Sequence, residues 1–356
     1  MKIHLLSGFL GSGKTTAIEQ AARILLRQNT RIGVITNDQG IRLVDAGFFK
    51  SLDIPARQVV NGCFCCNYDE LERNIESLVE TNNPEMIFAE SVGSCTDIVA
   101  TVMKPLLFYR KHIEVTVSVF ADARLLYILL NDNTALFDRE VNYIYNKQLE
   151  EAGIIVINKI DLMNEGQLHH LHMTMDERFR QKKIIYQNSL DAVSLQQWLD
   201  AFRDDSSGRV LSSLDIDYDI YGAGEAKLAW LDEEISIYQS AHAAAVDALD
   251  LMNTIDKEIR SKNYPIGHLK FLLNGKHKIS FTATSQAEDS ANIEYDPSHF
   301  ASLLINARVQ TEPHVLASLV TDAIAQVMER SGCSMIVNSV SSFQPGYPRP
   351  THRLAN

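Results

Sequence analysis

Residues 8–15 read Gly-Phe-Leu-Gly-Ser-Gly-Lys-Thr, which is the pattern of a phosphate-binding loop. The apolar residues 1–6 before it predict a short buried strand, and residues 15–27 carry apolar side chains at helical spacing. In this context, backbone N–H groups and a helix N-terminus surround the phosphates of a nucleotide. We therefore expect the nucleotide to be bound by Gly8, Gly11, Ser12, Gly13, Lys14, Thr15 and Thr16.

The composition limits the class of protein. The chain has 356 residues, of which 46% are apolar, enough for two hydrophobic cores. Its net charge of −12 disfavours nucleic acid and anionic membranes as partners, and no apolar stretch reaches the length of a membrane span. Three of the five cysteines are crowded together, unlike a disulfide framework, so a reducing cytoplasm is the expected location.

Strands and helices alternate after the phosphate loop. Apolar, β-branched runs predict strands at 31–36, 58–60, 86–89, 115–120, 153–157 and 183–186. Helical spacing predicts helices at 69–80, 123–130, 137–150 and 194–202. Such alternation predicts an α/β P-loop NTPase fold with a mostly parallel, doubly wound sheet, whose ligands gather at the carboxyl ends of the strands.

The second half of the chain has a different pattern. Polar breaks predict a first domain over residues 1–204, a linker over 205–224 and a C-terminal tail over 344–356. Between linker and tail, residues 225–343 predict a smaller α+β domain, with the ferredoxin-like fold as one option. Its expected strands are 227–237, 267–273, 278–284 and 307–310, and its expected helices are 241–261 and 314–330.

A second motif indicates the base. Asn158-Lys159-Ile160-Asp161 follows a strongly apolar strand, and the Asp161 carboxylate can accept hydrogen bonds from N1–H and the 2-amino group of guanine. Adenine has no such pair of donors. The Lys159 stem would pack on the base, and Asn158 would tie this loop to the phosphate loop; a helix cap is the structural alternative. Ser189, after the next strand, is a further candidate for a backbone contact to the base.

Acidic residues end two other predicted strands. Glu90, followed by Gly93, suits a carboxylate that orients Mg²⁺ or water before a backbone N–H that senses the γ-phosphate. Asp38 is a candidate for contacting Mg²⁺ through water, with a turn-forming residue as the alternative. We expect Lys14, Glu90 and Asp38 to act in hydrolysis, and Thr15, Asp38 and Glu90 to surround Mg²⁺. Because no glutamine takes an obvious catalytic place, slow turnover is expected.

Three thiols lie within four residues, at Cys63, Cys65 and Cys66. Their convergence needs an irregular backbone, which Asn61-Gly62 and Asn67 allow. Three thiolates suit Zn²⁺, Cu(I) or another thiophilic ion and leave a fourth position open, which favours handing the metal on. The alternatives are small buried side chains beside a tight turn and a redox pair of Cys65 and Cys66.

These motifs, in this order, resemble the CobW-type metallochaperone GTPases, relatives of the GTPases that help to load nickel into hydrogenase and urease. The resemblance covers about residues 1–199, and residues 225–343 are loosely similar to the family's C-terminal domain. It implies GTP and Mg²⁺ as ligands and a transition metal on Cys63, Cys65 and Cys66, with Zn²⁺ expected and Co²⁺ or Ni²⁺ as alternatives. The implied partner is a client metalloenzyme or a protein of cofactor biosynthesis; a homodimer is an open alternative.

Some residues depart from the family pattern or leave their role open. Ser94-Cys95-Thr96-Asp97 is an unusual continuation after Gly93, and Cys95 could join the metal site or be a core thiol. His169, His170 and His172 could bind metal, but an exposed helix is the simpler expectation.

Three functions therefore remain open. The first is a GTPase that delivers a metal or services a metal cofactor. The second is a metal buffer with negligible turnover. The third is a nucleotide-driven activator of a corrinoid or other metalloenzyme that carries no metal. The guanine motif argues against ATP, and the cysteines argue against a metal-free role.

Overall fold

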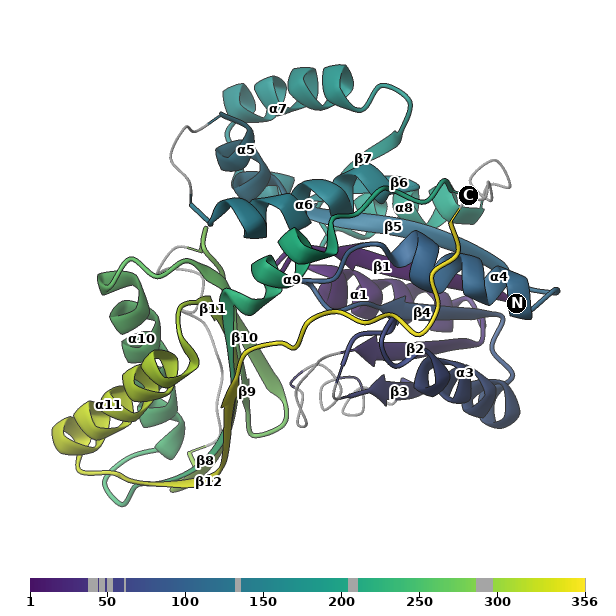
Figure 1. The fold of residues 1–356 in the computed structure, drawn as a ribbon. Helices are drawn as coiled ribbons and strands as arrows, with labels where there is room; N and C mark the ends of the chain where they lie inside the picture. Colours follow the sequence, from purple (N-terminus) through teal and green to yellow (C-terminus); the bar gives the residue numbers. More distant parts are fainter. Residues whose placement is uncertain are drawn as a thin grey trace. The chain divides into compact units, whose positions relative to one another are not determined.

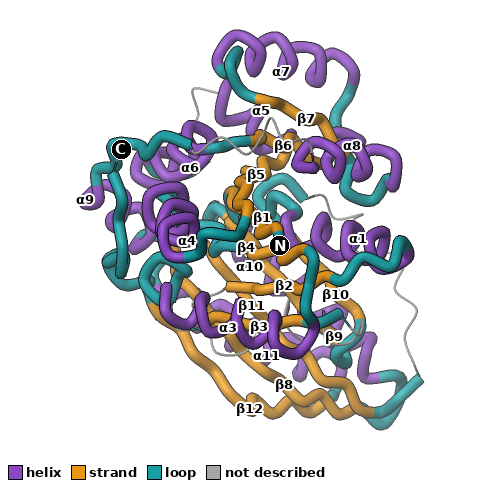
Figure 2. Tube along the Cα trace, turned by 90° about the vertical axis from the view of Figure 1, so that its right-hand side faces the viewer, coloured by secondary structure: helices purple, strands orange, loops and turns teal. Residues whose placement is uncertain are grey.

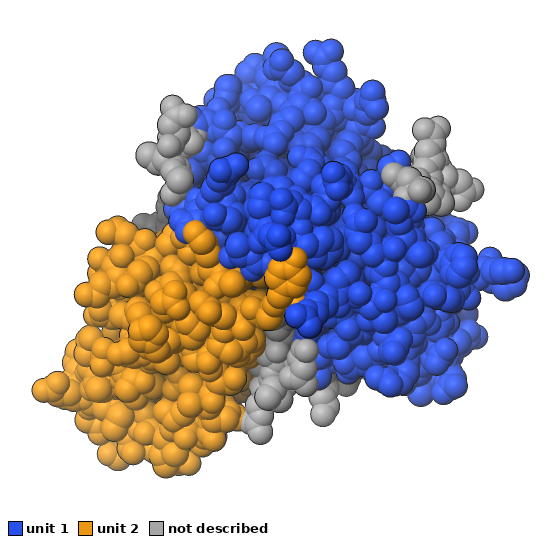
Figure 3. All heavy atoms as spheres, viewed as in Figure 1, with its two compact units in different colours: residues 1–39, 53–224, 348–356 blue, residues 40–52, 225–347 orange. Residues whose placement is uncertain are grey.

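The computed structural model describes residues 1–37, 44, 49, 54–60, 62–131, 136–203, 211–285 and 297–355. The chain forms two compact units (Figure 3). Unit 1 contains Met1–Gln39, Asp53–Gly224 and Pro348–Asn356, and unit 2 contains Gly40–Leu52 and Glu225–Tyr347. Within the described ranges, no helix combines the length and the apolar character needed to cross a membrane.

Unit 1 is built on a seven-stranded parallel sheet with the order β3-β2-β4-β1-β5-β6-β7 (Figure 1). Its strands are β1 (Lys2–Gly8), β2 (Ile32–Asn37), β3 (Ala56–Val59), β4 (Met86–Glu90), β5 (Glu114–Asp122), β6 (Ile154–Asn158) and β7 (Lys183–Gln187). β1, β2, β4 and β6 are buried along almost their whole length, as expected for strands covered on both faces. The doubly wound P-loop fold is confirmed.

Helices cover both faces of this sheet. Figure 2 shows α1 and α8 on one side and α4 and α6 on the other. The helices are α1 (Lys14–Arg27), α3 (Tyr68–Asn82), the π-helix η1 (Val99–Met103), α4 (Lys104–Tyr109), α5 (Ala123–Asn131), α6 (Arg139–Glu151), the 3₁₀-helix η2 (Ile160–Leu162), α7 (Glu165–Arg178), α8 (Ala192–Arg203) and α9 (Tyr218–Ala226). Phe88 of β4 and Trp198 and Phe202 of α8 pack around the ring of His4 in β1.

Unit 2 is an antiparallel sheet with the order β10-β9-β11-β8-β12. Its elements are β8 (Leu228–Tyr238), α10 (Ala244–Ser261), β9 (Ile266–Leu273), β10 (His277–Phe281), β11 (Phe300–Gln310), α11 (Pro313–Ser331) and β12 (Ser334–Phe343). Without β10, this is the βαββαβ order of the ferredoxin-like fold, so β10 is an addition at one edge. Leu251 and Ile255 of α10 and Val320 of α11 lie in one apolar core with Leu231 and Ile305 of the sheet.

The division of the chain differs from the expected boundaries in three places. Of the expected linker, residues 211–224 belong to unit 1, where Tyr221 is buried and its hydroxyl accepts from the Thr96 N–H at 3.4 Å. The expected tail also returns to unit 1 from Pro348 onward. Residues 40–52 instead belong to unit 2, where the Val44 N–H donates to Asn306 Oδ1 at 2.9 Å. Polar breaks in a sequence indicate where turns occur. The boundaries between the two units depend instead on contacts between segments that are distant in the sequence.

Candidate nucleotide and metal site

The phosphate loop follows β1 and depends on two glycines. Gly8 has φ 127°, and a Cβ there would lie 2.1 Å from the carbonyl oxygen of Phe120. Gly13 has φ 90°, and a Cβ there would lie 2.3 Å from Asn158 Nδ2. Any larger residue would clash at both positions, which explains this part of the motif. Gly13 also precedes α1, so the loop ends at a helix N-terminus.

Lys14 and Thr15 are the first two residues of α1, and both are buried. Lys14 Nζ donates to the carbonyl oxygens of Gly8 at 2.6 Å and Phe9 at 3.3 Å, so the ammonium group curls back over the loop. Thr15 Oγ1 donates to Glu90 Oε1 at 2.9 Å, and both side chains are buried. A hydroxyl and a carboxylate are hard oxygen donors, so this pair fits Mg²⁺.

The sequence also predicted that Gly93 and Asp38 act near the phosphates. Gly93 lies against the phosphate loop, because a Cβ there would be 2.9 Å from the backbone nitrogen of Leu10. Asp38 lies outside the described residues. Of the remaining loop residues, Ser12 is buried and Thr16 is partly buried.

Asn158 ties the base-recognition segment to the phosphate loop. Its Nδ2 donates to the Ser12 carbonyl at 2.9 Å, and its Oδ1 accepts from the N–H of Ser189 at 3.1 Å and from the Ser189 Oγ at 2.8 Å. Ser189 therefore supports Asn158 in this structure. Asp161 lies on the short helix η2 and is exposed to solvent. Its carboxylate is thus accessible to a ligand beside the loop.

Asp122 holds Lys159 in place, a role that the sequence analysis missed. Lys159 Nζ donates to the Gly11 carbonyl at 2.7 Å and pairs with Asp122 Oδ2 at 2.8 Å. The other carboxylate oxygen of Asp122 accepts from the N–H groups of Arg124 at 2.9 Å and Leu125 at 3.2 Å, at the start of α5. The available signal was an acidic residue at the end of a parallel strand, where ligand-binding groups gather.

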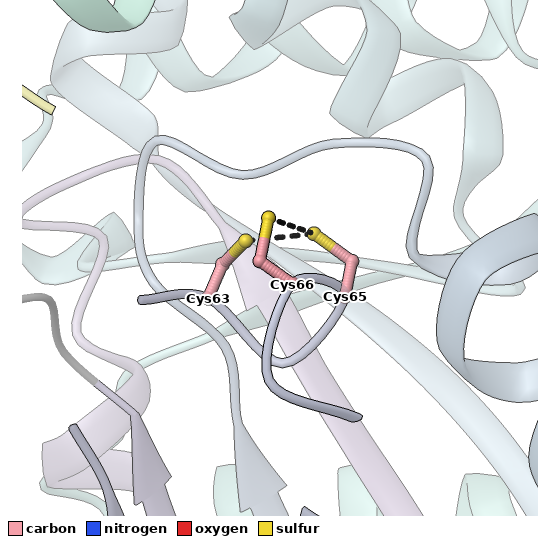
Figure 4. A group of neighbouring side chains, drawn as sticks. All are labelled: Cys63, Cys65 and Cys66. Carbon is pink, nitrogen blue, oxygen red and sulfur yellow. Dashed lines mark hydrogen bonds between the residues drawn. The ribbon is translucent and has the colours of Figure 1, made fainter. Parts of the chain in front are cut away.

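The three thiols converge on one loop between β3 and α3 (Figure 4). The Sγ atoms of Cys63 and Cys65 lie 2.7 Å apart and those of Cys65 and Cys66 lie 3.8 Å apart, with all three within 4.8 Å of one another. The N–H groups of Cys66 and Asn67 both donate to the Cys63 carbonyl, at 3.1 and 2.9 Å. This turn replaces the strand geometry that would point Cys65 and Cys66 to opposite faces.

The side chain of Asn37 anchors the cysteine loop to the end of β2. Its Nδ2 donates to the carbonyls of Gly62 at 2.7 Å and Val59 at 3.2 Å, and its Oδ1 accepts from the Phe64 N–H at 2.8 Å. The neighbouring residue of β2, Thr36, lies opposite Glu90 in the parallel register. The cysteine loop and Glu90 therefore lie on either side of the end of one strand.

The three thiols differ in the direction in which their pKa values are shifted. Hydrogen bonds from Cys65 and Cys66 hold the pKa of the Cys63 thiol well below its usual value. The hydrogen bond to Cys63, together with burial, raises the pKa of Cys65 well above its usual value. A separate hydrogen bond between Cys66 and Cys63, together with burial, raises the pKa of Cys66 to about 12. A thiophilic cation would supply positive charge that favours the thiolate form of all three side chains.

The segment after Pro348 lies against the cysteine loop. The Thr351 N–H donates to the Cys65 carbonyl at 2.7 Å, and Thr351 Oγ1 donates to the Cys66 carbonyl at 3.1 Å. The Arg349 N–H donates to Cys66 Sγ at 3.3 Å. No short-range pattern could have indicated these contacts, because 283 residues separate Arg349 from Cys66.

The histidine cluster does not form a second metal site in this structure. His170 bonds Asn131 Oδ1 at 2.5 Å, and the ring of His172 stacks on Tyr186 with centroids 3.5 Å apart. Over the residues that the structure describes, the three cysteines are the one set of three or more His, Cys, Asp or Glu donors close enough to share an ion. The expectation of a helix for this segment is confirmed by α7.

Two curated relatives share part of the chain. A zinc chaperone CobW from Sinorhizobium sp is 27% identical over 203 residues, which are 50% of this chain and 56% of the relative. A zinc chaperone YeiR from Escherichia coli is 28% identical over 166 residues, which are 45% of this chain and 47% of the relative. The chain thus spans about half the length of each of these relatives.

Solved structures and a family model were also compared with the chain. HypB from Helicobacter pylori in complex with nickel has a TM-score of 0.44 and 16% identity, over 60% of this chain and 91% of that one. HypB from Archaeoglobus fulgidus has a TM-score of 0.42 and 18% identity, over 57% of this chain and 89% of that one. The model described as "CobW/HypB/UreG, nucleotide-binding domain" matches residues 2–187, which include the phosphate loop, the cysteine loop and the Asn158–Asp161 segment. The chain therefore belongs to the CobW/HypB/UreG family, as its motifs indicated.

Proposed function

We propose that this protein is a GTP-hydrolysing metallochaperone that carries Zn²⁺ on Cys63, Cys65 and Cys66 and passes it to a client metalloprotein. The observation that carries the proposal is the convergence of three thiols in the same compact unit as a phosphate loop. Thiolates favour Zn²⁺ over harder divalent ions. The two relatives described as zinc chaperones support the same ion.

Guanine selectivity would come from Asp161. An exposed carboxylate at this position can accept two hydrogen bonds from guanine, and Lys159, fixed by Asp122 and by the Gly11 carbonyl, presents its stem beside it. Asn158 fixes the spacing between this segment and the phosphate loop, because it bonds the Ser12 carbonyl. A nucleotide that lacks both donors would leave the carboxylate without partners.

Hydrolysis would be carried out by the Lys14, Thr15 and Glu90 group. Lys14 would exchange its bonds to the Gly8 and Phe9 carbonyls for phosphate oxygens. Mg²⁺ on Thr15 and Glu90 would neutralise charge on the phosphates. Glu90 would also orient the attacking water. Asp38, which the family resemblance places in this group, completes the proposed set of residues.

Metal transfer would be coupled to the nucleotide through Asn37. This residue bonds the cysteine loop on both sides of Cys63, and the chain continues from it into the Asp38 segment. A change of nucleotide that moves the end of β2 would therefore also move the loop that carries the thiols. Release of Zn²⁺ after hydrolysis follows if this movement spreads the three sulfur atoms.

The test compares a Cys63/Cys65/Cys66→Ser variant with Cys333→Ser, which changes a cysteine of unit 2. Both proteins are purified anaerobically, and their zinc content and GTP turnover are measured. We expect the triple variant to lose zinc and keep GTP binding, while the control keeps both. Unchanged zinc in the triple variant would refute the carrier role. Zinc binding without turnover in the wild type would instead support a metal buffer.

A further inference from the structure

The segment after Pro348 bonds a second part of unit 1 besides the cysteine loop. The Leu354 N–H donates to the Ala100 carbonyl at 2.9 Å, and the Leu354 carbonyl accepts from the Ser213 hydroxyl at 2.8 Å. Residues 349–354, here called the strap, therefore extend from the cysteine loop to η1.

An ion pair joins the strap to the segment that follows Glu90. Arg353 Nε donates to Asp97 Oδ2 at 2.8 Å, and the same oxygen accepts from the Tyr218 hydroxyl at 2.7 Å. The Asp97 side chain is 1% exposed, so the loss of Arg353 would leave a buried carboxylate without the cation that pairs with it. Arg353 Nη2 also donates to the Leu214 carbonyl at 2.8 Å, so the guanidinium group fixes this end of the strap at two points.

Asp97 has a strained backbone and lies close in the chain to the proposed magnesium site. Its φ of 65° is in the left-handed region, which residues with a side chain rarely adopt. Such conformations persist only where surrounding contacts hold them, and they are frequent in switch segments. Glu90 accepts from Thr15 at 2.9 Å, and residues 91–96 alone separate it from Asp97. A nucleotide that moves Glu90 would therefore act on Asp97 through a short stretch of chain.

The other end of the strap contacts the most accessible of the three thiols. Cys63 and Cys65 are 4% and 5% exposed, whereas Cys66 is partly exposed. The Arg349 N–H donates to Cys66 Sγ at 3.3 Å, and Thr351 bonds the carbonyls of Cys65 and Cys66. An N–H that donates to a metal-bound thiolate stabilises the charge on its sulfur. A closed strap would therefore favour retention of the ion and leave less room for a client ligand at Cys66.

We propose that the strap regulates metal transfer and that the Arg353–Asp97 ion pair holds it closed. The inference rests on the proposed metal-carrying function and adds its regulation. With GTP bound, the ion pair keeps the strap against Cys66. After hydrolysis, movement of the Glu90 segment draws Asp97 away from Arg353, and the strap opens to a ligand from the client.

The test measures the rate at which zinc-loaded protein passes Zn²⁺ to an excess of a colorimetric chelator, with Mg²⁺ and either a non-hydrolysable GTP analogue or GDP. With the analogue, Arg353→Gln should release Zn²⁺ on the order of 10-fold faster than the wild type, the effect of losing one charge-assisted hydrogen bond. With GDP the two proteins should differ little, because the strap is already open. Arg330→Gln is the matched control, since it removes an arginine that pairs with Asp250 in unit 2. Unchanged release from Arg353→Gln, or an equal increase in both nucleotide states, would overturn the proposal.

A second substitution separates the ion pair from general damage to the fold. Asp97→Asn removes the charge while keeping a side chain that tolerates the left-handed backbone. It should speed release as Arg353→Gln does, and the double variant should be no faster than either single variant, because all three lack the same ion pair. Additive effects would show that the two residues act independently and would contradict the proposal.

Hydrogen exchange gives a readout that does not depend on zinc. In the metal-free protein, the N–H groups of Thr351 and Leu354 should exchange faster with GDP than with the GTP analogue, and equally fast in the two states of Arg353→Gln. Equal protection in the two states of the wild type would refute the regulation and leave the carrier function standing. If the strap responds to the nucleotide but the Cys63/Cys65/Cys66→Ser variant keeps its zinc, the carrier function fails, and regulation of transfer fails with it.

Discussion

Asn37 and Phe64 are 27 residues apart, and the Oδ1 of Asn37 accepts the backbone N–H of Phe64 at 2.8 Å. Phe64 lies between Cys63 and Cys65, so this bond fixes the centre of the cysteine loop to the end of β2. The other end of the same amide donates to the Gly62 carbonyl at 2.7 Å. One buried side chain therefore positions the backbone on both sides of Cys63.

Asn37→Ala should weaken Zn²⁺ binding although it removes no ligand. The substitution leaves the Phe64 N–H and the Gly62 carbonyl without their partner, at a cost of about 2 kcal/mol. If this whole cost destabilises the zinc-binding conformation of the cysteine loop, Zn²⁺ affinity falls roughly 30-fold. Asn74→Ala is the matched control, because Asn74 Nδ2 bonds the Gln58 carbonyl of β3 at 2.9 Å. Chelator competition measures both variants; equal affinities would show that Asn37 does not position the thiols.

Asp161→Asn should reduce GTP affinity by at least about 100-fold, because the amide can no longer accept both guanine donors. Affinity for Mg²⁺ should change little, since the Thr15 and Glu90 pair is untouched. Asp176→Asn, at an exposed site on α7, controls for the loss of one charge. Titration with fluorescent guanine and adenine nucleotides gives the readout. GTP binding as tight as in the wild type would remove Asp161 from base recognition.

Thr351→Pro should make Cys66 more reactive than Thr351→Ala does. Alanine removes the Oγ1 bond to the Cys66 carbonyl, and proline removes in addition the N–H bond to the Cys65 carbonyl. Each lost bond is worth about 1 kcal/mol, so alkylation through local opening should rise about fivefold per bond. The modification of each thiol is followed by mass spectrometry. If neither variant differs from the wild type, the segment after Pro348 does not protect the loop.

His4 should make the protein less stable in acid. Burial lowers the pKa of His4 from 6.5 to about 3, and its ring nitrogens bond the hydroxyls of Thr116 and Ser118. The unfolded chain therefore binds this proton at a higher pH than the folded protein. As a result, the free energy of unfolding should fall as the pH drops from 6.5 towards 3, by up to about 1.4 kcal/mol per pH unit.

His4→Gln removes this titration while leaving the other histidines in place. Chemical unfolding at a series of pH values should give a shallower fall for the variant than for the wild type between pH 6.5 and 3. The comparison of slopes does not depend on the overall stability of the variant. Identical slopes would mean that the imidazole is not kept neutral in the core.

The sequence predicted the features that depend on local pattern and spacing. The phosphate loop, the parallel strands and the helices α1 and α10 each have a periodic or motif signal within one segment. By contrast, β12 went unpredicted because its polar and apolar residues are mixed, most of its side chains are exposed and its pairing with β8 is long-range. Asn37 and Asp122 each act through a partner that is distant in the sequence.

The same reasoning applies to the metal site. Three thiols in four residues indicated an ion, but the placement of their loop depends on Asn37, which lies 27 residues from Phe64 in the sequence. A pattern of cysteines along the chain does not reveal such a partner.

Coupling between the nucleotide and the ion is tested most directly by the Zn²⁺ affinity of the wild-type protein with bound Mg²⁺ and either a non-hydrolysable GTP analogue or GDP. Coupling through Asn37 predicts tighter binding with the GTP analogue, by on the order of 10-fold or more. Equal Zn²⁺ affinities in the two nucleotide states would contradict it.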